Sequence, residues 1–295
     1  RRCKADISSY QPDVIIYIDY PGFNLRIAEW AHTQGFHNHY YISPQVWAWK
    51  SNRVVKMKQT LAALYTILPF EKSYFKEQHH YEVNYVGHPL LDSIDSAPPS
   101  QPFRNTHQLD ERPIIALLPG SRSQEVKKML PLFLKVIPHF PEHQFIVAGT
   151  TSLGVSFYTN LLMATPCKVV IGNTYELLQS SEAALVTSGT ATLEAALFGV
   201  PQVVCYKTSA LSYWLAKQWV KLEWISLVNL ILDQQVIQEL IQEDCTPISL
   251  QKSLNQLLDP KRVAQIQKHY KQLRDQLDQG GASRKTADLI YSSLT

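Results

Sequence analysis

Short apolar runs alternate with helical patterns along the whole chain. Most of these runs are continuous stretches of Val, Ile, Leu and Ala rather than strict alternations of apolar and polar residues. Strands that are buried on both faces have this composition, as in parallel sheets covered by helices. The pattern predicts an α/β protein of doubly wound, Rossmann-like architecture. The predicted strands are Val14–Asp19, His39–Ile42, Ala62–Leu68, Asn84–Val86, Ile114–Leu118, Gln144–Ala148, Lys168–Ile171, Ala183–Val186 and Gln202–Tyr206.

A stretch rich in Pro, Ser and Asn, without hydrophobic periodicity, separates two halves of the chain. Beyond the second half, apolar residues at spacings of three and four predict a helix, which Gly280-Gly281 ends. We expect these last helices to pack back on the chain or to be exchanged in a dimer. The expected parts are a Rossmann-like domain at 1–95, a linker at 96–112, a second Rossmann-like domain at 113–260 and C-terminal helices at 261–295.

Composition narrows the class of protein. The 295 residues are 45% hydrophobic and 18% charged, which fits a globular protein and not a disordered chain. The net charge of +3 is too small to indicate a nucleic-acid partner. The four scattered cysteines lack metal-ligand spacing, so reduced thiols in a cytosolic protein are the simplest interpretation.

The sequence contains no recognisable targeting signal. The sequence shows no run of 18 apolar residues and no signal peptide, so no membrane-spanning helix is predicted. The chain starts at Arg1 and runs almost directly into a strand-like segment, so we expect a fragment whose natural N-terminus lies upstream.

The first candidate site follows the strand in IIALLPGSRSQEV. In open α/β sheets, ligands bind beyond the carboxyl ends of the strands. Gly120 allows close approach of the backbone to a ligand, and Ser121 can cap the following helix. Free N–H groups at a helix start and the guanidinium fork of Arg122 both suit a phosphate. The alternative is a capped helix with a surface arginine, and this segment alone does not separate the two.

A second candidate follows the strand in LVTSGTATLEAALFGV. Ser188, Gly189, Thr190 and Thr192 supply hydroxyl and N–H groups for a second phosphate, with Thr190 as the expected cap. Glu194 lies one helical turn after Thr190, where its carboxylate can accept hydrogen bonds from ribose hydroxyls. A lone Glu more often only complements the helix dipole. Two such sites in one domain favour a nucleotide, although neither is a Walker loop or a GxGxxG.

The first half offers weaker candidates. Asp19 ends an otherwise apolar strand, where its carboxylate can face a cleft and act as general base on an acceptor hydroxyl. A turn closed together with Pro21-Gly22 is the simpler interpretation of that residue alone. His88 follows another predicted strand, and a lone His is usually structural.

Two tryptophan-rich segments leave their role open. Trp47 and Trp49 stand beside Lys50 and Arg53, which suits stacking on a sugar or contact with lipid. A core-facing Trp with a solvated basic face is the commoner arrangement. The segment SYWLAKQWVKLEW suits an interface with a partner subunit or with a membrane surface, and periodicity does not decide which.

Seven motifs, in this order along the chain, resemble those of a known family. They are IDYPGFN, SPQVWAWK, LPFEKSYF, YVGHPLLD, LLPGSRSQEV, SGTATLEAALFGVPQVV and WISLVNLIL. With them the chain closely resembles the lipid-A-disaccharide synthases from about Pro12 to about Ile241. Seven ordered motifs are far more specific than any one of them.

The resemblance implies an inverting glycosyltransferase of the GT-B type, whose first Rossmann-like domain is incomplete here at its N-terminus. Such an enzyme transfers 2,3-diacylglucosamine from UDP-2,3-diacylglucosamine to 2,3-diacylglucosamine 1-phosphate. The products are UDP and the β-1,6-linked tetraacyl disaccharide 1-phosphate, the precursor of lipid A. The resemblance further implies a cytoplasmic enzyme, peripheral on the inner face of the inner membrane, with no cofactor and no bound metal. Known members can pair through exchanged C-terminal segments, so a homodimer is among the expectations that follow from the resemblance.

The resemblance also assigns roles to individual residues. Asp19 matches the general base, and Arg122 matches an arginine tied to activity, which we assign to the diphosphate. His88 is a candidate for contact with the substrate, and Met129 and Leu130 are candidates to face the membrane. Val228 stands where the family usually has Pro, beside the donor candidate Asn229. The candidates for UDP binding are Gly120, Ser121, Arg122, Ser188, Gly189, Thr190, Thr192, Glu194 and Asn229.

One family segment, the Gly-rich GEASGD, does not occur in these 295 residues. Roughly two βα units are expected to be missing with it. We therefore expect an intact UDP-binding half and little transferase activity. Two rivals stay open: another UDP-sugar enzyme of the same architecture, such as a UDP-N-acetylglucosamine 2-epimerase, and a nonenzymatic nucleotide-sugar or membrane-interaction module. An epimerase would change the donor alone.

Overall fold

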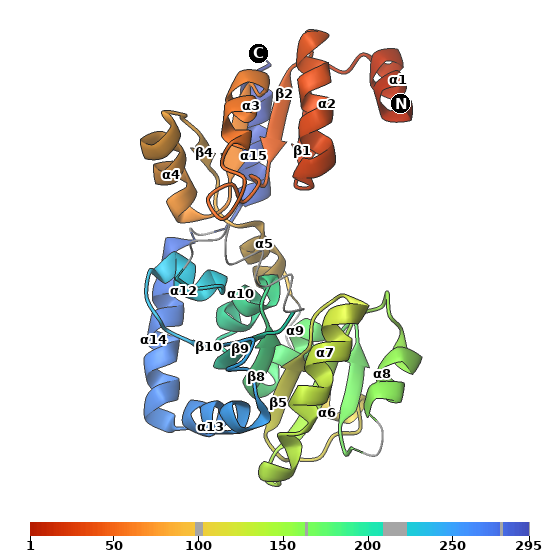
Figure 1. The fold of residues 1–295 in the computed structure, drawn as a ribbon, viewed down its shortest axis with the longest axis vertical. Helices are drawn as coiled ribbons and strands as arrows, with labels where there is room; N and C mark the ends of the chain where they lie inside the picture. The colour runs from red at the N-terminus through yellow and green to blue at the C-terminus, as the bar shows by residue number, and fades with distance from the viewer. Residues whose placement is uncertain (98–102, 163–164, 209–222, 278–279, 295) are drawn as a thin grey trace. The chain divides into compact units, whose positions relative to one another are not determined.

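The chain folds into two compact α/β units, each built on one parallel sheet (Figure 1). The computed structural model describes residues 1–97, 103–162, 165–208, 223–277 and 280–294. The first unit comprises Arg1–Asp92 and Gln276–Thr295, and the second comprises Ser93–Gln218 and Leu222–Asp275. The predicted α/β class with two Rossmann-like sheets is confirmed. Residues 212–222 of the tryptophan-rich segment SYWLAKQWVKLEW and residues 98–102 of the expected linker lie outside the described residues.

The sheet of the first unit has its strands in sequence order. They are β1 (Ile15–Ile18), β2 (Asn38–Tyr41), β3 (Ala63–Thr66) and β4 (Asn84–Tyr85). Helices α2 (Pro21–Thr33), α3 (Arg53–Thr60) and α4 (Pro69–His79) share a core with this sheet, in which Tyr40, Met57 and Phe75 are fully buried. Ile290 of α15 (Ala282–Ser292) packs in a separate cluster with Tyr65 and Val86. The C-terminal helix therefore belongs to the core of the first unit.

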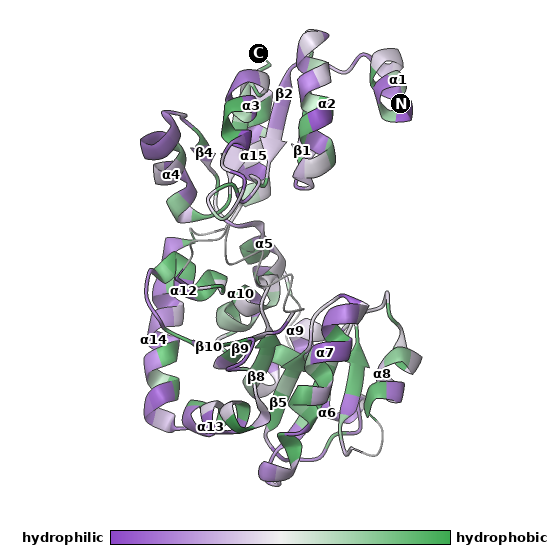
Figure 2. Ribbon diagram, in the orientation of Figure 1, coloured by the Kyte–Doolittle hydropathy of each residue, from purple (hydrophilic) through white to green (hydrophobic). Residues whose placement is uncertain are grey.

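The sheet of the second unit has the strand order β10-β9-β8-β5-β6-β7, with every pair parallel. Its strands are β5 (Ile114–Leu118), β6 (Gln144–Gly149), β7 (Lys168–Ile171), β8 (Ser181–Thr187), β9 (Gln202–Tyr206) and β10 (Gln238–Ile241). Every residue of β5 is buried, which explains the continuous apolar run in the sequence. Figure 2 shows the same concentration of hydrophobic residues in β5 and β8.

Helices cover both faces of this second sheet. Side chains of α9 (Thr174–Gln179) and α10 (Thr190–Leu197) join the core on one face, together with Phe103 of α6 (Phe103–Thr106). Helices α7 (Ser123–Leu134), α8 (Val155–Leu162) and α13 (Pro247–Leu257) pack together as a separate layer. The remaining helical elements are α1 (Arg2–Tyr10), α5 (Pro89–Asp95), a 3-10 turn at Ile137–His139, α12 (Leu227–Leu232) and α14 (Pro260–Gln276).

All nine predicted strands and the long C-terminal helix are present, and β10 is an addition. The segment QELI of β10 lies at the edge of the sheet and buries only Leu240 fully, so it lacks the apolar run that marks the other strands. The proposal that Met129 and Leu130 face a membrane is wrong for this structure. Both residues lie on the inner face of α7, and neither has any exposed surface.

Candidate functional site

The candidate site of the second unit is defined by the point where its strand order reverses. From β5 the chain builds β6 and β7 on one side, and it then crosses to build β8, β9 and β10 on the other side. The strands β5 and β8 are therefore neighbours whose following loops lead to opposite sides of the sheet. Such a switch point opens a crevice at the carboxyl edge, where ligands bind in open α/β sheets. Both sequence candidates, 119–122 and 188–190, are the loops at this point.

The loop after β5 is closed by Glu125, a residue that the sequence analysis did not single out. One oxygen of the Glu125 carboxylate, Oε2, accepts hydrogen bonds from the backbone N–H groups of Ser121 and Arg122, both at 3.3 Å. The other oxygen accepts from the Arg122 guanidinium at 2.8 Å. Gly120 has φ +109°, and a Cβ at this position would lie 2.7 Å from Glu125 Oε2. Glycine is therefore required here both for backbone conformation and for space.

This arrangement corrects one expectation. The N-cap of helix α7 is Arg122, whose backbone N–H donates to the Glu125 carboxylate, and the Ser121 hydroxyl does not cap the helix. Glu125 stands three residues after the N-cap, where a carboxylate can reach back to the N-cap N–H, but Arg122 has no acceptor atom with which to complete a capping box. The geometry also shows that three donors converge on a single carboxylate. A group of donors that holds one anion is suited to another, such as a phosphate.

The loop after β8 lacks such a carboxylate. Helix α10 has Gly189 at its N-cap, and no side chain forms a capping hydrogen bond there. Thr190 is the first helical residue, so the expectation that it caps the helix is wrong. The Thr192 hydroxyl is buried and donates to the carbonyl of Gly189 at 2.8 Å. The Ser188 hydroxyl donates to the carbonyl of Ile225 at 3.3 Å. Two of the three candidate hydroxyls, those of Ser188 and Thr192, therefore hold this loop in place.

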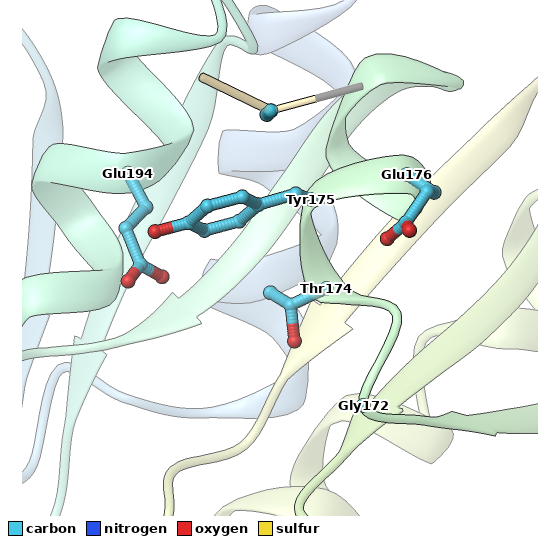
Figure 3. Close-up of a pocket in the computed structure, with 6 residues that line it drawn as sticks. Gly172, Thr174, Tyr175, Glu176 and Glu194 are labelled. Carbon is cyan, nitrogen blue, oxygen red and sulfur yellow. The ribbon is translucent and has the colours of Figure 1, made fainter. Parts of the chain in front are cut away.

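Glu194 and Tyr175 line a hollow of about 350 Å³ beside this loop (Figure 3). The other lining residues are Ala97, Gly172, Thr174 and Glu176. Figure 3 shows the hydroxyl of Tyr175 pointing toward the carboxylate of Glu194. Burial raises the pKa of Glu194 above the ordinary value for a carboxyl group. Burial also raises the pKa of the Tyr175 phenol, and the nearby charge of Glu194 adds to the rise. The hollow has the size of a small-ligand site.

Tyr175 was missed because its segment, IGNTYELL, carries no motif beyond another change from strand to helix. Gly172 follows β7 directly, with φ +77°, and α9 begins two residues later at Thr174. The signal that was available is positional, since β7 and β8 both end at the carboxyl edge of the sheet.

Asn229 lies at the start of α12 and has no exposed surface. Its amide nitrogen donates to the carbonyl of Ile237 and to Glu239, both at 2.9 Å. Its amide oxygen accepts from the backbone N–H groups of Val236 and Ile237, at 2.9 and 3.0 Å. Glu239 also accepts from the N–H groups of Ile225 and Ser226. In this structure Asn229 holds neighbouring loops together, and its contact with a nucleotide stays a prediction.

Asp19 lies in the first unit, at the carboxyl end of the edge strand β1. Its backbone is in the left-handed region with φ +46°, which is uncommon for a residue other than glycine. The carbonyl of Asp19 accepts from the Asn24 amide at 2.7 Å and from the Tyr40 hydroxyl at 2.5 Å. Its N–H donates to the carbonyl of Tyr41 at 3.2 Å. The main chain is thus held on both sides while the residue as a whole is exposed, so a substrate can reach it.

The backbone near Asp19 shows a concentration of strained conformations. Tyr20 and Ile42, which lie next to Asp19 and at the end of β2, have φ values of +45° and +62°. A positive φ is especially unfavourable for a β-branched residue such as Ile. Conformations of this kind tend to gather at functional sites, where the surrounding structure holds them.

His88 lies in the same unit and is 6% exposed. Its Nδ1 accepts a hydrogen bond from the N–H of Leu90 at 3.1 Å, at the start of α5. Burial lowers the pKa of His88 to about 4, so the ring is neutral at physiological pH. Its role as a substrate contact stays a prediction.

Comparison with known proteins identifies the family. The lipid-A-disaccharide synthetase family matches residues 1–291. The lipid-A-disaccharide synthase of Coxiella burnetii (strain CbuG_Q212) is 35% identical over 289 residues, which cover 96% of this chain and 76% of the relative. The chain belongs to the lipid-A-disaccharide synthase family. It is thus a member of a glycosyltransferase family with GT-B architecture, and the epimerase alternative is not favoured.

Solved structures share the fold of this family member at low sequence identity. The UDP-GlcNAc 2-epimerase from Neisseria meningitidis, bound to UDP-GlcNAc, matches with a TM-score of 0.68 at 13% identity, over 99% of this chain and 79% of that one. The spinosyn rhamnosyltransferase SpnG matches with a TM-score of 0.64 at 12% identity, over 98% of this chain and 75% of that one. Among the described helices of the chain, none is long and apolar enough to cross a membrane.

Proposed function

We propose that this lipid-A-disaccharide synthase family member transfers 2,3-diacylglucosamine from UDP-2,3-diacylglucosamine to 2,3-diacylglucosamine 1-phosphate. The products are UDP and the β-1,6-linked tetraacyl disaccharide 1-phosphate. The observation that carries the proposal is the convergence of three donors on the Glu125 carboxylate at the switch point of the second sheet. In a chain of this family, that is a ready-made position for the diphosphate of a UDP-sugar.

The proposed role of Arg122 follows from where charge develops in the reaction. As the glycosidic bond breaks, negative charge accumulates on the diphosphate of the departing UDP. The guanidinium and the N–H groups of Ser121 and Arg122 stabilise this charge more strongly in the transition state than in the bound donor. Gly120 lets the diphosphate approach the main chain. The diphosphate replaces the carboxylate of Glu125, which turns away.

The nucleoside occupies the hollow beside Glu194. The ionised Glu194 carboxylate accepts hydrogen bonds from the ribose hydroxyls, and Tyr175 forms one wall. The backbone N–H groups of Gly189 and Thr190 face the donor, because no side chain caps α10, while the N–H of Ser188 donates to the carbonyl of Cys205. Thr192 and Asn229 act by holding the loops in place, through the backbone hydrogen bonds that they already make.

Asp19 is the proposed general base. It takes the proton from the 6-hydroxyl of the acceptor while that oxygen attacks the anomeric carbon from the face opposite UDP. A single displacement of this kind inverts the configuration at the anomeric carbon, which gives the β linkage. The exposed residue on a fixed main chain suits this role, because a general base must be positioned and also reach the substrate.

Both substrates carry acyl chains, so we place the reaction at the cytoplasmic face of the inner membrane, with the enzyme as a peripheral protein. The chemistry requires no cofactor, since the acceptor hydroxyl is the nucleophile and UDP is the leaving group. A homodimer is part of this proposal.

The function is tested with Asp19→Asn in the complete gene product, with Asp13→Asn as the matched control on an exposed carboxylate before β1. Loss of a positioned general base should lower kcat by about 10²- to 10⁴-fold. The affinity for UDP, measured by titration calorimetry, should not change. A variant with the parent's activity would refute the base role. Conversion of the donor without acceptor would point to an epimerase instead.

A further inference from the structure

A second hollow, of about 740 Å³, lies in the first unit and is not used by the roles described so far. It is lined by residues 46–52, which lie between β2 and α3, by Arg53 at the start of α3, and by Tyr74 of α4. This segment contains the paired tryptophans and cations whose role the sequence left open.

Two cations share one aromatic ring in this hollow. The Nζ of Lys50 lies 4.5 Å from the centroid of the Trp49 ring, and the Cζ of Arg53 lies 5.3 Å from it. Both distances are within the range of a cation–π interaction. Within the described part of the chain, neither cation forms an ion pair with a carboxylate. Two unneutralised positive charges beside a hollow are complementary to an anion.

Side chains of α4 hold this segment in place through hydrogen bonds and a ring contact. The indole N–H of Trp47 donates to the buried Glu71 carboxylate at 3.2 Å, and the Tyr74 hydroxyl donates to the carbonyl of Val46 at 3.2 Å. The ring of Trp47 also meets Phe70 edge to face at 5.0 Å. Burial raises the pKa of Glu71 to about 7, although its three hydrogen bonds oppose the rise. The hydrogen bonds and the ring contact of Trp47 and Val46 therefore attach the segment to α4.

The segment that lines the hollow and Asp19 both follow strands that end at the same edge of the first sheet. Asp19 follows β1 and residues 46–53 follow β2, and the two strands are parallel neighbours. The Tyr40 hydroxyl donates to the carbonyl of Asp19. The N–H of Asp19 donates to the carbonyl of Tyr41, the last residue of β2, at 3.2 Å. An acceptor whose hydroxyl meets Asp19 would extend toward Lys50 and Arg53.

We propose that the hollow at residues 46–53 binds the phosphate group of the acceptor sugar through Lys50 and Arg53, with Trp49 as the wall for its apolar part. This inference rests on the proposed function, because it names the acceptor subsite of that reaction. The phosphate is at carbon 1 and the attacking hydroxyl at carbon 6, so the two groups lie at opposite ends of the sugar. The subsite therefore orients the acceptor as well as binding it.

The test uses two acceptors, 2,3-diacylglucosamine 1-phosphate and the same lipid without its phosphate. The variant is Lys50→Gln with Arg53→Gln, since Gln keeps part of each stem packed on Trp49 and removes the charge. Lys72→Gln on α4 is the control, because Lys72 is exposed and does not line the hollow. Transfer is measured in the complete gene product with each acceptor, together with the KM for the donor and the thermal unfolding midpoint. Direct binding of each acceptor in detergent micelles is measured in parallel.

Hydrogen bonds to the charged phosphate should strengthen acceptor binding. The parent should therefore use the phosphorylated acceptor about 10- to 100-fold more efficiently than the acceptor without phosphate. The double variant should lose this preference through a higher acceptor KM, with the donor KM unchanged. The control should keep the preference. Persistence of the parent's preference in a folded double variant would overturn the inference.

A membrane role is distinguished by sedimentation with phosphatidylglycerol vesicles. If the double variant loses vesicle binding but keeps its preference for the phosphorylated acceptor, the cations bind lipid headgroups and the inference is wrong. If the parent transfers no sugar, the proposed function fails. Micelle binding then still decides whether the cations hold the phosphate.

Discussion

The two loops at the switch point of the second sheet have the same topological position but differ in how their donors are occupied. In the loop after β5, Glu125 already holds the N–H groups of Ser121 and Arg122 and the Arg122 guanidinium. In the loop after β8, no side chain caps α10. The carboxylate of Glu194, in the same helix, lines a hollow instead. The first loop is thus a site with an internal anion, and the second is open.

This difference separates two tasks in binding a nucleotide-sugar. An internal carboxylate satisfies donors that would otherwise be unpaired, and it must be displaced when the diphosphate arrives. A site of that kind binds the ground state less tightly but has its donors in position for the transition state. The open hollow at Glu194 has no such competitor, so it is suited to affinity for the nucleoside.

The largest effect is expected for Arg122→Ala. Loss of a guanidinium that stabilises the departing diphosphate should lower kcat by about 10²- to 10³-fold, as for other groups that stabilise developing charge. The affinity for UDP should fall much less. The measurement is steady-state kinetics of the complete gene product, with calorimetry for UDP. Lys128→Ala removes an exposed cation from the same helix and should behave as the parent. A loss of UDP affinity with kcat unchanged would show that Arg122 binds the ground state and the transition state equally strongly.

An intermediate effect is expected for Glu194→Gln. The charged acceptor for the ribose is lost, so UDP affinity should fall by about 10- to 100-fold. The variant should also bind UDP and 2′-deoxy-UDP alike, while the parent prefers UDP. Glu176→Gln changes another carboxylate of the hollow and serves as the control. If the parent protein binds UDP and 2′-deoxy-UDP equally tightly, Glu194 does not bind the ribose 2′-hydroxyl and the assignment is wrong.

Glu194 also predicts a pH dependence. Its pKa is raised by burial, and only the ionised carboxylate accepts both hydroxyl protons. UDP binding should therefore weaken as the pH falls through this raised pKa, which lies above the usual range near 4.3. Calorimetry across this pH interval should show the decline in the parent and not in Glu194→Gln.

The smallest effect tests the internal anion directly. Glu125→Gln removes the charge that the diphosphate must displace, and exposed ion pairs of this kind contribute only about 0.2–1 kcal/mol. UDP affinity should rise by about 1.5- to 5-fold, and more at low salt than at high salt. Gln124→Glu, one residue earlier, adds a carboxylate outside the loop and should not raise the affinity. A fall in affinity with Glu125→Gln would show that Glu125 orients Arg122 for the ligand.

Local patterns in the sequence were sufficient for much of the fold. Runs such as Ile114–Leu118 are buried on both faces, so their composition alone marks them as strands of a covered parallel sheet. The edge strand Gln238–Ile241 was missed because it buries little. The caps were wrong at Ser121 and Thr190, because both hydroxyls were judged by residue type and not by which residue begins the helix.

The sequence by itself determined the α/β class, the strands of both sheets and, through its ordered motifs, the family. These properties depend on periodicity and residue type within short segments. Only the tertiary structure decided that Glu125 occupies the loop after β5, that Tyr175 faces Glu194, that Asn229 is fully buried and that Met129 lies in the core. Those outcomes depend on which strands become neighbours and on which side chains then compete for the same donors, and no local pattern records that competition.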